Sequence, residues 1–207
     1  MPKITKIEQQ KNENRVSLYV DDEFFMGINK EIVYTLMLKI GQEVEKERLE
    51  HIITEEMYLK AKSKALKLLH FSSRTEKEMR ERLKKNEYSE ETIERVIAFL
   101  KEYNFINDSE LTKHMVRNKS IGKKYGKKRI KQDLYRKGID MNLIENTIEE
   151  EIDEEKEYEN ALSLAQKKMK TIKDTDQRKI YEKLGRYLAY RGYEYDLIRK
   201  VINRCLK

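Results

Sequence analysis

The chain has 207 residues, of which 40% are charged, and its formal net charge is +7, so we expect a nucleic acid or an acidic protein surface as partner. Its single cysteine excludes a disulfide framework within one chain. The sequence contains no run of about 18 apolar residues, so we expect no membrane span. The first residues form no apolar signal core, and we therefore expect a cytoplasmic protein.

The first 28 residues have the periodicity of β-structure. Apolar and polar residues alternate over residues 16–20, which is the period of a half-buried strand. Asp21 and Asp22 then predict a turn, and residues 23–28 the returning strand. A third strand is expected over residues 3–9. Because a lone hairpin is marginal in water, this small extension must pack on another part of the chain.

From residue 45 onward the helical period dominates. Only seven glycines and one proline interrupt the chain, which favours long helices. The sequence Ser73-Arg-Thr-Glu76 has the form of a capping box, in which a hydroxyl and a carboxylate bind the free amides of a helix start. Ser89 and Asn107 predict two further helix starts.

The helical region contains a tandem repeat. Five apolar residues recur at offsets of 0, 4, 9, 14 and 18, and successive copies are 51 and 54 residues apart. Offsets 0 and 4 share one face of a helix, offsets 14 and 18 share a face of the next, and offset 9 fills the turn between them. The fifteen positions are Met79, Leu83, Tyr88, Ile93 and Ile97; Ile130, Leu134, Ile139, Ile144 and Ile148; and Leu184, Leu188, Tyr193, Ile198 and Ile202.

This pattern predicts a mainly α fold, an elongated tandem array of three-helix repeats with a small N-terminal β-hairpin extension. Gly138 and Gly192 occupy the slot at the end of the second helix, where a left-handed cap is favoured, and Glu87 fills it in the first copy. The expected domains are the hairpin with a helical extension and three repeats. Their predicted boundaries are 1–54, 55–108, 109–153 and 154–207.

Positive charge is concentrated in the middle copy. Residues 109–138 contain eleven Lys or Arg and two acids. Basic residues around the Gly122 to Gly126 turn suggest a clamp for phosphate or carboxylate groups, and those at the ends of the second helices suggest a second stripe. A solvated basic face and a helix-dipole role are the alternatives. The predicted partner-binding or nucleic-acid-binding residues are Lys123, Lys124, Tyr125, Lys127, Lys128, Arg129, Lys131, Arg136, Lys137 and Arg191.

Two features of this prediction stay open. Tyr125 either stacks on a base or packs against its own helix. Residues 145–159 carry nine acids against one base, and they form either a solvated helix face or a surface that repels acidic partners.

No motif supports catalysis. The three histidines are isolated and have no metal-ligand spacing to a cysteine or to each other. Carboxylates are plentiful, but none forms a recognisable acid–base pair. We therefore predict no enzyme, no catalytic residue, no metal and no cofactor.

The chain resembles the RecX family of recombination regulators over its whole length. The resemblance rests on RTEKEMRERLKK at residues 74–85, YNFINDSEL at 103–111 and GKKRIKQDLYRKGI at 126–139, together with the N-terminal hairpin, which is similar to that of low-GC Gram-positive members. Asn104 stands where family members commonly have glycine, and Glu87 replaces the glycine of the later copies.

The resemblance implies regulation without catalysis. Such proteins bind the RecA recombinase, in particular its filament on single-stranded DNA, and limit ATP hydrolysis, strand exchange and co-protease activity. This places the chain in homologous recombination, DNA repair and the SOS response, as a monomer. The alternative is a helical repeat protein that binds nucleic acid directly and acts without RecA.

Overall fold

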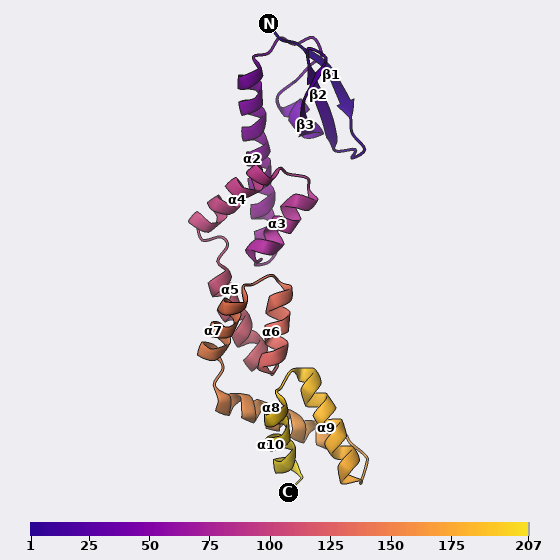
Figure 1. Cartoon of the computed structure of the whole chain (residues 1–207), viewed down its shortest axis with the longest axis vertical. Helices are drawn as coiled ribbons and strands as arrows, with labels where there is room; N and C mark the ends of the chain where they lie inside the picture. The colour runs from indigo at the N-terminus through magenta and orange to yellow at the C-terminus, as the bar shows by residue number, and fades with distance from the viewer. Residues whose placement is uncertain (207) are drawn as a thin grey trace. The chain divides into compact units, whose positions relative to one another are not determined.

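The computed structural model describes residues 1–206, which form a three-stranded sheet, ten α-helices and one π-helical turn (Figure 1). They fall into two compact units, Met1–Ser72 with Met79–Phe105, and Ser73–Glu78 with Ile106–Lys207. The predicted mainly helical fold of three-helix repeats with a small N-terminal sheet is confirmed. Within residues 1–206, none of the helices combines the length and apolar character that a bilayer crossing requires.

The three strands come first in the chain, and the helices follow. The strands are β1 (Ile4–Gln9), β2 (Arg15–Val20) and β3 (Glu23–Asn29). The helices of the first half are α1 (Lys30–Thr35), α2 (Lys46–Phe71), α3 (Glu76–Lys85) and α4 (Glu90–Glu102). Those of the second half are α5 (Asp108–Arg117), η1 (Asn118–Gly122), α6 (Lys127–Arg136), α7 (Met141–Glu151), α8 (Glu154–Met169), α9 (Gln177–Arg191) and α10 (Tyr195–Cys205).

The sheet of the first unit is antiparallel, with strand order β1-β2-β3. The third strand expected over residues 3–9 is present as β1, and the predicted turn is formed by Asp21 and Asp22, both with positive φ, which is the geometry that matches the twist of a two-residue hairpin. The alternating residues of β2 are buried as predicted, and they form one core with Leu49, Ile53 and Met57 of α2. The hairpin is thus stabilised by burial against a long helix.

Helix α2 is continuous from the sheet to the first repeat. It buries Leu49, Ile53, Met57, Ala61 and Ala65, spaced by four residues along one side. The large residues at its start pack on the sheet. Helix α4 packs further along α2, where Arg95 pairs with Glu55 at 2.8 Å and the Lys62 ammonium lies 3.7 Å from the centre of the Phe99 ring. One helix therefore serves both the extension and the first repeat.

The repeat anchors form the cores of the helical units. All fifteen are buried except Tyr88, which is half-buried. In the second unit, α5, α6 and α7 enclose one apolar cluster, and α8, α9 and α10 enclose another. The 4-9-14-18 spacing therefore describes which side chains each three-helix repeat buries.

The second helix of every repeat ends in the same hydrogen-bonded motif. Glu87, Gly138 and Gly192 all have left-handed φ, of 59°, 80° and 88°. The amide after each of them bonds back to the carbonyl of the offset-4 residue, at 3.5, 3.4 and 3.2 Å. This is the Schellman motif, and its accompanying apolar contact explains the anchor at offset 9. The first repeat thus keeps the backbone geometry although it lacks the glycine.

The atoms packed against each cap explain why the cap residue is glycine in the second and third repeats and glutamate in the first. An added Cβ at Gly138 would lie 2.0 Å from the Lys77 side chain, and one at Gly192 would lie 2.4 Å from the Arg129 backbone nitrogen. The Glu87 side chain has room and is held by hydrogen bonds: Arg15 donates to the Glu87 carbonyl, and the Asn12 amide donates to the Glu87 carboxylate at 2.8 Å. The loop between β1 and β2 therefore covers the cap of the first repeat, where a side chain fits.

The predicted capping box at Ser73 and Glu76 is wrong by two residues. Thr75 and Glu78 form it: the Glu78 amide donates to the Thr75 hydroxyl at 3.2 Å, and the Thr75 amide donates to the Glu78 carboxylate at 3.1 Å. The Thr75 hydroxyl also donates to the Lys137 carbonyl at 2.7 Å, so a tertiary contact selects this residue. The caps predicted at Ser89 and Asn107 are confirmed.

Gly185 offers a test of intrinsic helix propensity. It lies inside α9, and an added Cβ would meet only Ile202 Cδ1, at 3.8 Å, which is ordinary contact. We expect Gly185→Ala to raise the free energy of unfolding by about 0.5–1 kcal/mol, because alanine loses less backbone entropy in a helix. Urea unfolding followed by circular dichroism measures this, and a loss of stability would contradict the spacing of α9 and α10.

Candidate partner-binding surface

The glycine-rich turn before α6 is a junction between the second and third repeats. The Gly126 amide donates to the Arg191 carbonyl at 3.0 Å, and the Lys128 amide donates to the Gly192 carbonyl at 3.1 Å. A Cβ at Gly126 would lie 2.4 Å from the Gly192 carbonyl oxygen, so the two backbones touch. These two amides are therefore used by the neighbouring repeat and are not available to an external anion.

Tyr125 lies inside this junction together with two of the predicted arginines. The guanidinium of Arg129 lies 4.4 Å from the centre of the half-buried Tyr125 ring, and that of Arg191 lies 5.6 Å from it. Arg129 also donates to the Tyr190 carbonyl at 3.0 Å, and Arg191 donates to the Lys123 carbonyl at 3.0 Å. Of the two alternatives for Tyr125, the structure shows packing, with cation–π contacts to both arginines.

Partly buried hydrogen bonds hold the same junction. The Tyr193 hydroxyl donates to the Lys124 carbonyl at 2.9 Å, and the Lys124 ammonium donates to the Ser163 hydroxyl at 3.2 Å. Burial, and secondarily the charge of Glu157, raises the pKa of Tyr193 well above its ordinary value. The phenol therefore keeps its proton and stays a donor across the physiological range.

Three of the six predicted lysines have carboxylate partners within the fold. The Lys127 ammonium lies 3.8 Å from Glu157, and its backbone amide donates to the same carboxylate at 3.0 Å. Lys131 pairs with Glu145, and Lys137 with Glu78 at 2.6 Å. Burial pushes the pKa of Glu78 upward, but hydrogen bonds from Lys137 and the Thr75 amide outweigh burial and lower it. Glu145 and Glu157 belong to the acidic segment 145–159, so part of that segment neutralises the basic stretch.

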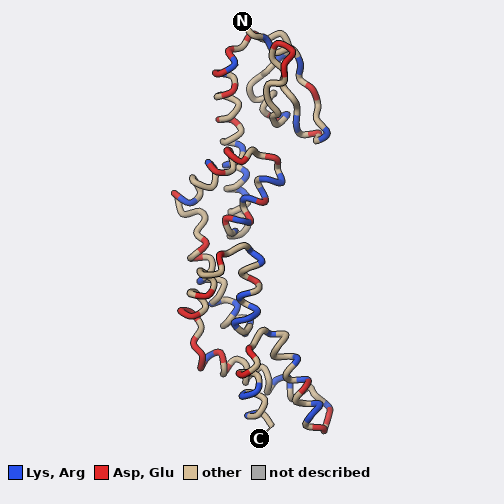
Figure 2. The backbone as a smooth tube through the Cα atoms, viewed as in Figure 1, with Lys and Arg blue, Asp and Glu red and all other residues tan. Residues whose placement is uncertain are grey.

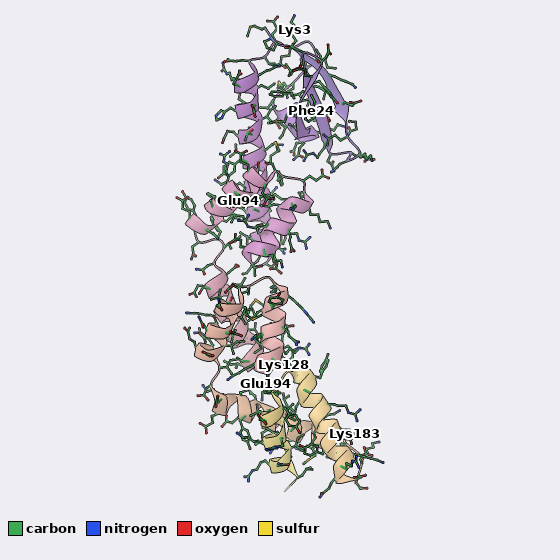
Figure 3. The ribbon with its side chains drawn as sticks, viewed as in Figure 1. Lys3, Phe24, Glu94, Lys128, Lys183 and Glu194 are labelled. Carbon is green, nitrogen blue, oxygen red and sulfur yellow. The ribbon has the colours of Figure 1, made fainter. Side chains whose placement is uncertain are left out.

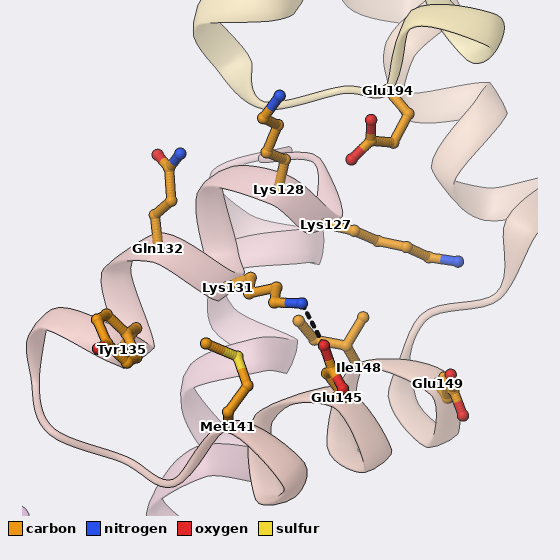
Figure 4. A pocket seen from close by; sticks show the side chains of 10 residues that line it. All are labelled: Lys127, Lys128, Lys131, Gln132, Tyr135, Met141, Glu145, Ile148, Glu149 and Glu194. Carbon is orange, nitrogen blue, oxygen red and sulfur yellow. Dashed lines mark hydrogen bonds and ion pairs between the residues drawn. The ribbon is translucent and has the colours of Figure 1, made fainter.

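Three predicted cations remain exposed, and none of them forms an ion pair with another residue of the described chain. Lys123 lies in the turn before α6, and Lys128 and Arg136 lie in the first and last turns of α6. Gln132 lies between them on the same side of the helix. We call Lys128, Gln132 and Arg136 the α6 strip; Lys128 is labelled in Figure 3, and Lys128 and Gln132 project together from α6 in Figure 4.

Grooves lie on both sides of the α6 strip. One, of about 360 Å³, lies between the strip and the end of α9, where Tyr190 is 71% exposed. The other, of about 590 Å³, has an apolar floor of Met141 and Ile148 and is flanked by Tyr135 (Figure 4). A surface with exposed tyrosines, an arginine and apolar recesses is typical of protein-binding sites. The pattern itself, with a four-residue spacing at 128, 132 and 136, was readable in the sequence, but Gln132 and Tyr135 were missed.

The fold defines a class, a tandem three-helix repeat protein with a small N-terminal sheet. Four family models match successive segments: the regulatory protein RecX N-terminal domain at residues 2–45, and the first, second and third three-helix domains of RecX at 61–100, 107–148 and 154–202. The four matches lie in the order of the chain.

Curated relatives and solved structures agree with these matches. The chain is 48% identical to the regulatory protein RecX of Clostridioides difficile over 98% of this chain and 95% of that protein, and 40% identical to that of Clostridium tetani over 99% and 94%. A crystal structure of regulatory protein RecX superposes with a TM-score of 0.69 at 25% identity, covering 98% of this chain and all of that one. Another, of RecX from Lactobacillus salivarius, gives 0.67 at 28% identity over 72% of this chain and 97% of that one. The chain belongs to the RecX family of regulatory proteins.

Proposed function

We propose that this protein binds the RecA recombinase and its filament on single-stranded DNA, and that binding limits ATP hydrolysis, strand exchange and co-protease activity. The proposed setting is homologous recombination, DNA repair and the SOS response in the cytoplasm, and the mode of action needs no catalytic group or cofactor. The observation that supports it is the α6 strip, whose two exposed charges form no ion pair with another described residue and lie between two grooves.

The chemistry of the strip suits a protein partner. Lys128 and Arg136 can pair with carboxylates, and Gln132 can donate and accept hydrogen bonds between them. Tyr135 and Tyr190 are 61% and 71% exposed, and large amphipathic rings of this kind contribute strongly to protein interfaces. A surface that only tracks phosphates would not need the apolar recess beside Tyr135.

The test is the ATP hydrolysis of the cognate RecA on single-stranded DNA. The wild-type protein is expected to slow hydrolysis, and the double variant Lys128→Glu/Arg136→Glu to need at least about tenfold more protein for the same effect, because two attractive charges become repulsive. The matched control is Arg199→Glu/Lys200→Glu, which makes the same charge change at two exposed positions of α10. The control is expected to act like the wild type.

Unchanged hydrolysis at saturating wild-type protein, without binding to the filament, would overturn the proposal. A protein that binds DNA but never a RecA filament would instead support the alternative, a nucleic-acid-binding repeat protein that acts alone. Equal losses in the strip variant and the α10 control would move the contact away from the α6 strip.

A further inference from the structure

The uncompensated positive charge of the second unit lies mainly in the third repeat. A groove of about 750 Å³ runs between the end of α8, the following connection and α9. Its charged lining consists of Lys168, Lys173, Asp174, Lys183 and Arg186, which we call the basic groove. Figure 2 shows Lys and Arg gathered where α8 leads into α9, and Lys183 is labelled in Figure 3.

The basic groove exists because the third repeat departs from the other two. Helix α9 begins at Gln177, seven residues before its first anchor, Leu184, whereas α6 begins at Lys127, three residues before Ile130. The extra turn and the connection after α8 form the two walls. The regular repeat pattern gives no indication of this feature.

The charge in the basic groove is only partly neutralised. Four cations face one carboxylate, Asp174, so the lining carries a net charge of 4 − 1 = +3. Asp174 is already paired with Lys183, whose hydrogen bond holds the pKa of that carboxyl below its ordinary value. Arg186 donates to the Glu182 carbonyl at 3.4 Å, and its guanidinium lies 3.9 Å from the Glu182 carboxylate, in an exposed setting where such a pair contributes little. Lys173 has no carboxylate partner among residues 1–206.

We propose that the basic groove binds the phosphodiester backbone of nucleic acid without reading its sequence. A row of cations on flexible stems along an open groove complements a polyanion, and binding releases the counterions condensed on it. Lysines dominate and no Asn or Gln lines the groove, so the described residues favour phosphate contacts over base contacts. No aromatic ring lines it within the described chain, so base stacking contributes nothing, and single strands and duplexes bind alike.

This inference extends the proposed function, on which it rests only for its biological setting. It assigns the direct DNA contact to the third repeat and leaves the α6 strip to the protein partner. The experiment therefore uses DNA without recombinase, so that a failure here is distinguishable from a failure of RecA binding.

The measurement is the fluorescence anisotropy of a labelled oligothymidylate, and of a duplex of equal length, titrated with the full chain at several salt concentrations. Lys173→Glu/Arg186→Glu is expected to lower the affinity at least about tenfold near 0.1 M salt, and to flatten the log–log salt slope on the single strand by about 1.4, for two lost phosphate contacts. The control, Arg199→Glu/Lys200→Glu, removes one lysine and one arginine from α10 of the same repeat. It is expected to change the affinity less than about threefold, because distant exposed charges are screened.

Three outcomes would overturn the inference. Equal losses in the groove variant and the control would show that net charge alone attracts DNA. Competition by polyglutamate as effective as that by unlabelled oligothymidylate of equal charge would assign the groove to an acidic protein. A strong preference for the single strand over the duplex would contradict a site that contacts only the backbone. Thermal unfolding of both variants confirms that each is folded.

Discussion

Gly192→Ala is expected to lower the free energy of unfolding of the second unit by about 3 kcal/mol. A left-handed φ of 88° costs a residue with a Cβ about 1 kcal/mol or more. The added Cβ would also lie 2.3 Å from Arg129 Cβ and 2.4 Å from the Arg129 backbone nitrogen. Because backbone cannot rotate away as a side-chain tip can, forcing the junction apart adds about 1–3 kcal/mol.

Gly41→Ala is the matched control for this prediction. Gly41 has nearly the same φ, 86°, but an added Cβ would meet nothing within 4 Å. It therefore carries the conformational cost alone, about 1 kcal/mol. Urea unfolding followed by circular dichroism and by tyrosine fluorescence measures both variants. Equal losses at the two glycines would mean that the α6–α9 junction is not closely packed.

Arg129→Ala is expected to destabilise the protein by about 2 kcal/mol, whereas Lys128→Ala is expected to change stability by less than about 0.5 kcal/mol. Arg129 stacks on Tyr125, lies 4.8 Å from the centre of the Tyr190 ring and donates to the Tyr190 carbonyl. Lys128 is exposed, and its ammonium has no described partner. Adjacent residues of the same charge thus have different roles, one within the junction and one on the surface.

A third variant separates charge from shape. Arg129→Lys keeps the positive charge but loses the planar group that stacks on the rings and donates to the carbonyl, so it is expected to recover less than half of the lost stability. Chemical denaturation of Arg129→Ala, Lys128→Ala and Arg129→Lys measures the free energy of unfolding of each variant. Full recovery by lysine would show that a positive charge alone is needed at this position.

The fold was predictable because its signal is local and repeated. The spacing 4-9-14-18 is a property of two helices and a turn, and each copy confirms the others. Tertiary contacts changed the details: the helix start near Ser73 is capped by Thr75, whose hydroxyl also binds the Lys137 carbonyl, 62 residues away. A capping motif read from sequence cannot register a partner from another repeat.

The candidate site was less predictable, because charge in a sequence does not show which charges meet. Lys127 is neutralised by a carboxylate 30 residues further on, and Lys137 by one 59 residues earlier. The sequence left Tyr125 open between stacking and packing and marked Arg129 as a binding residue, whereas in the fold both contribute to the junction of two repeats. The α6 strip and the basic groove are therefore the surfaces that we propose as partner-binding sites.

The sequence by itself determined the class of fold, the family, the three-helix repeats and the left-handed slot at the end of each second helix, because helix periodicity and turn chemistry act over a few residues. Only the tertiary structure decided which basic residues are available for binding. Electrostatic compensation depends on distances of a few ångströms between side chains far apart in the chain, so the most basic stretch became largely a packed and paired junction. The connection after α8, inconspicuous in the repeat pattern, became the wall of the most basic groove described.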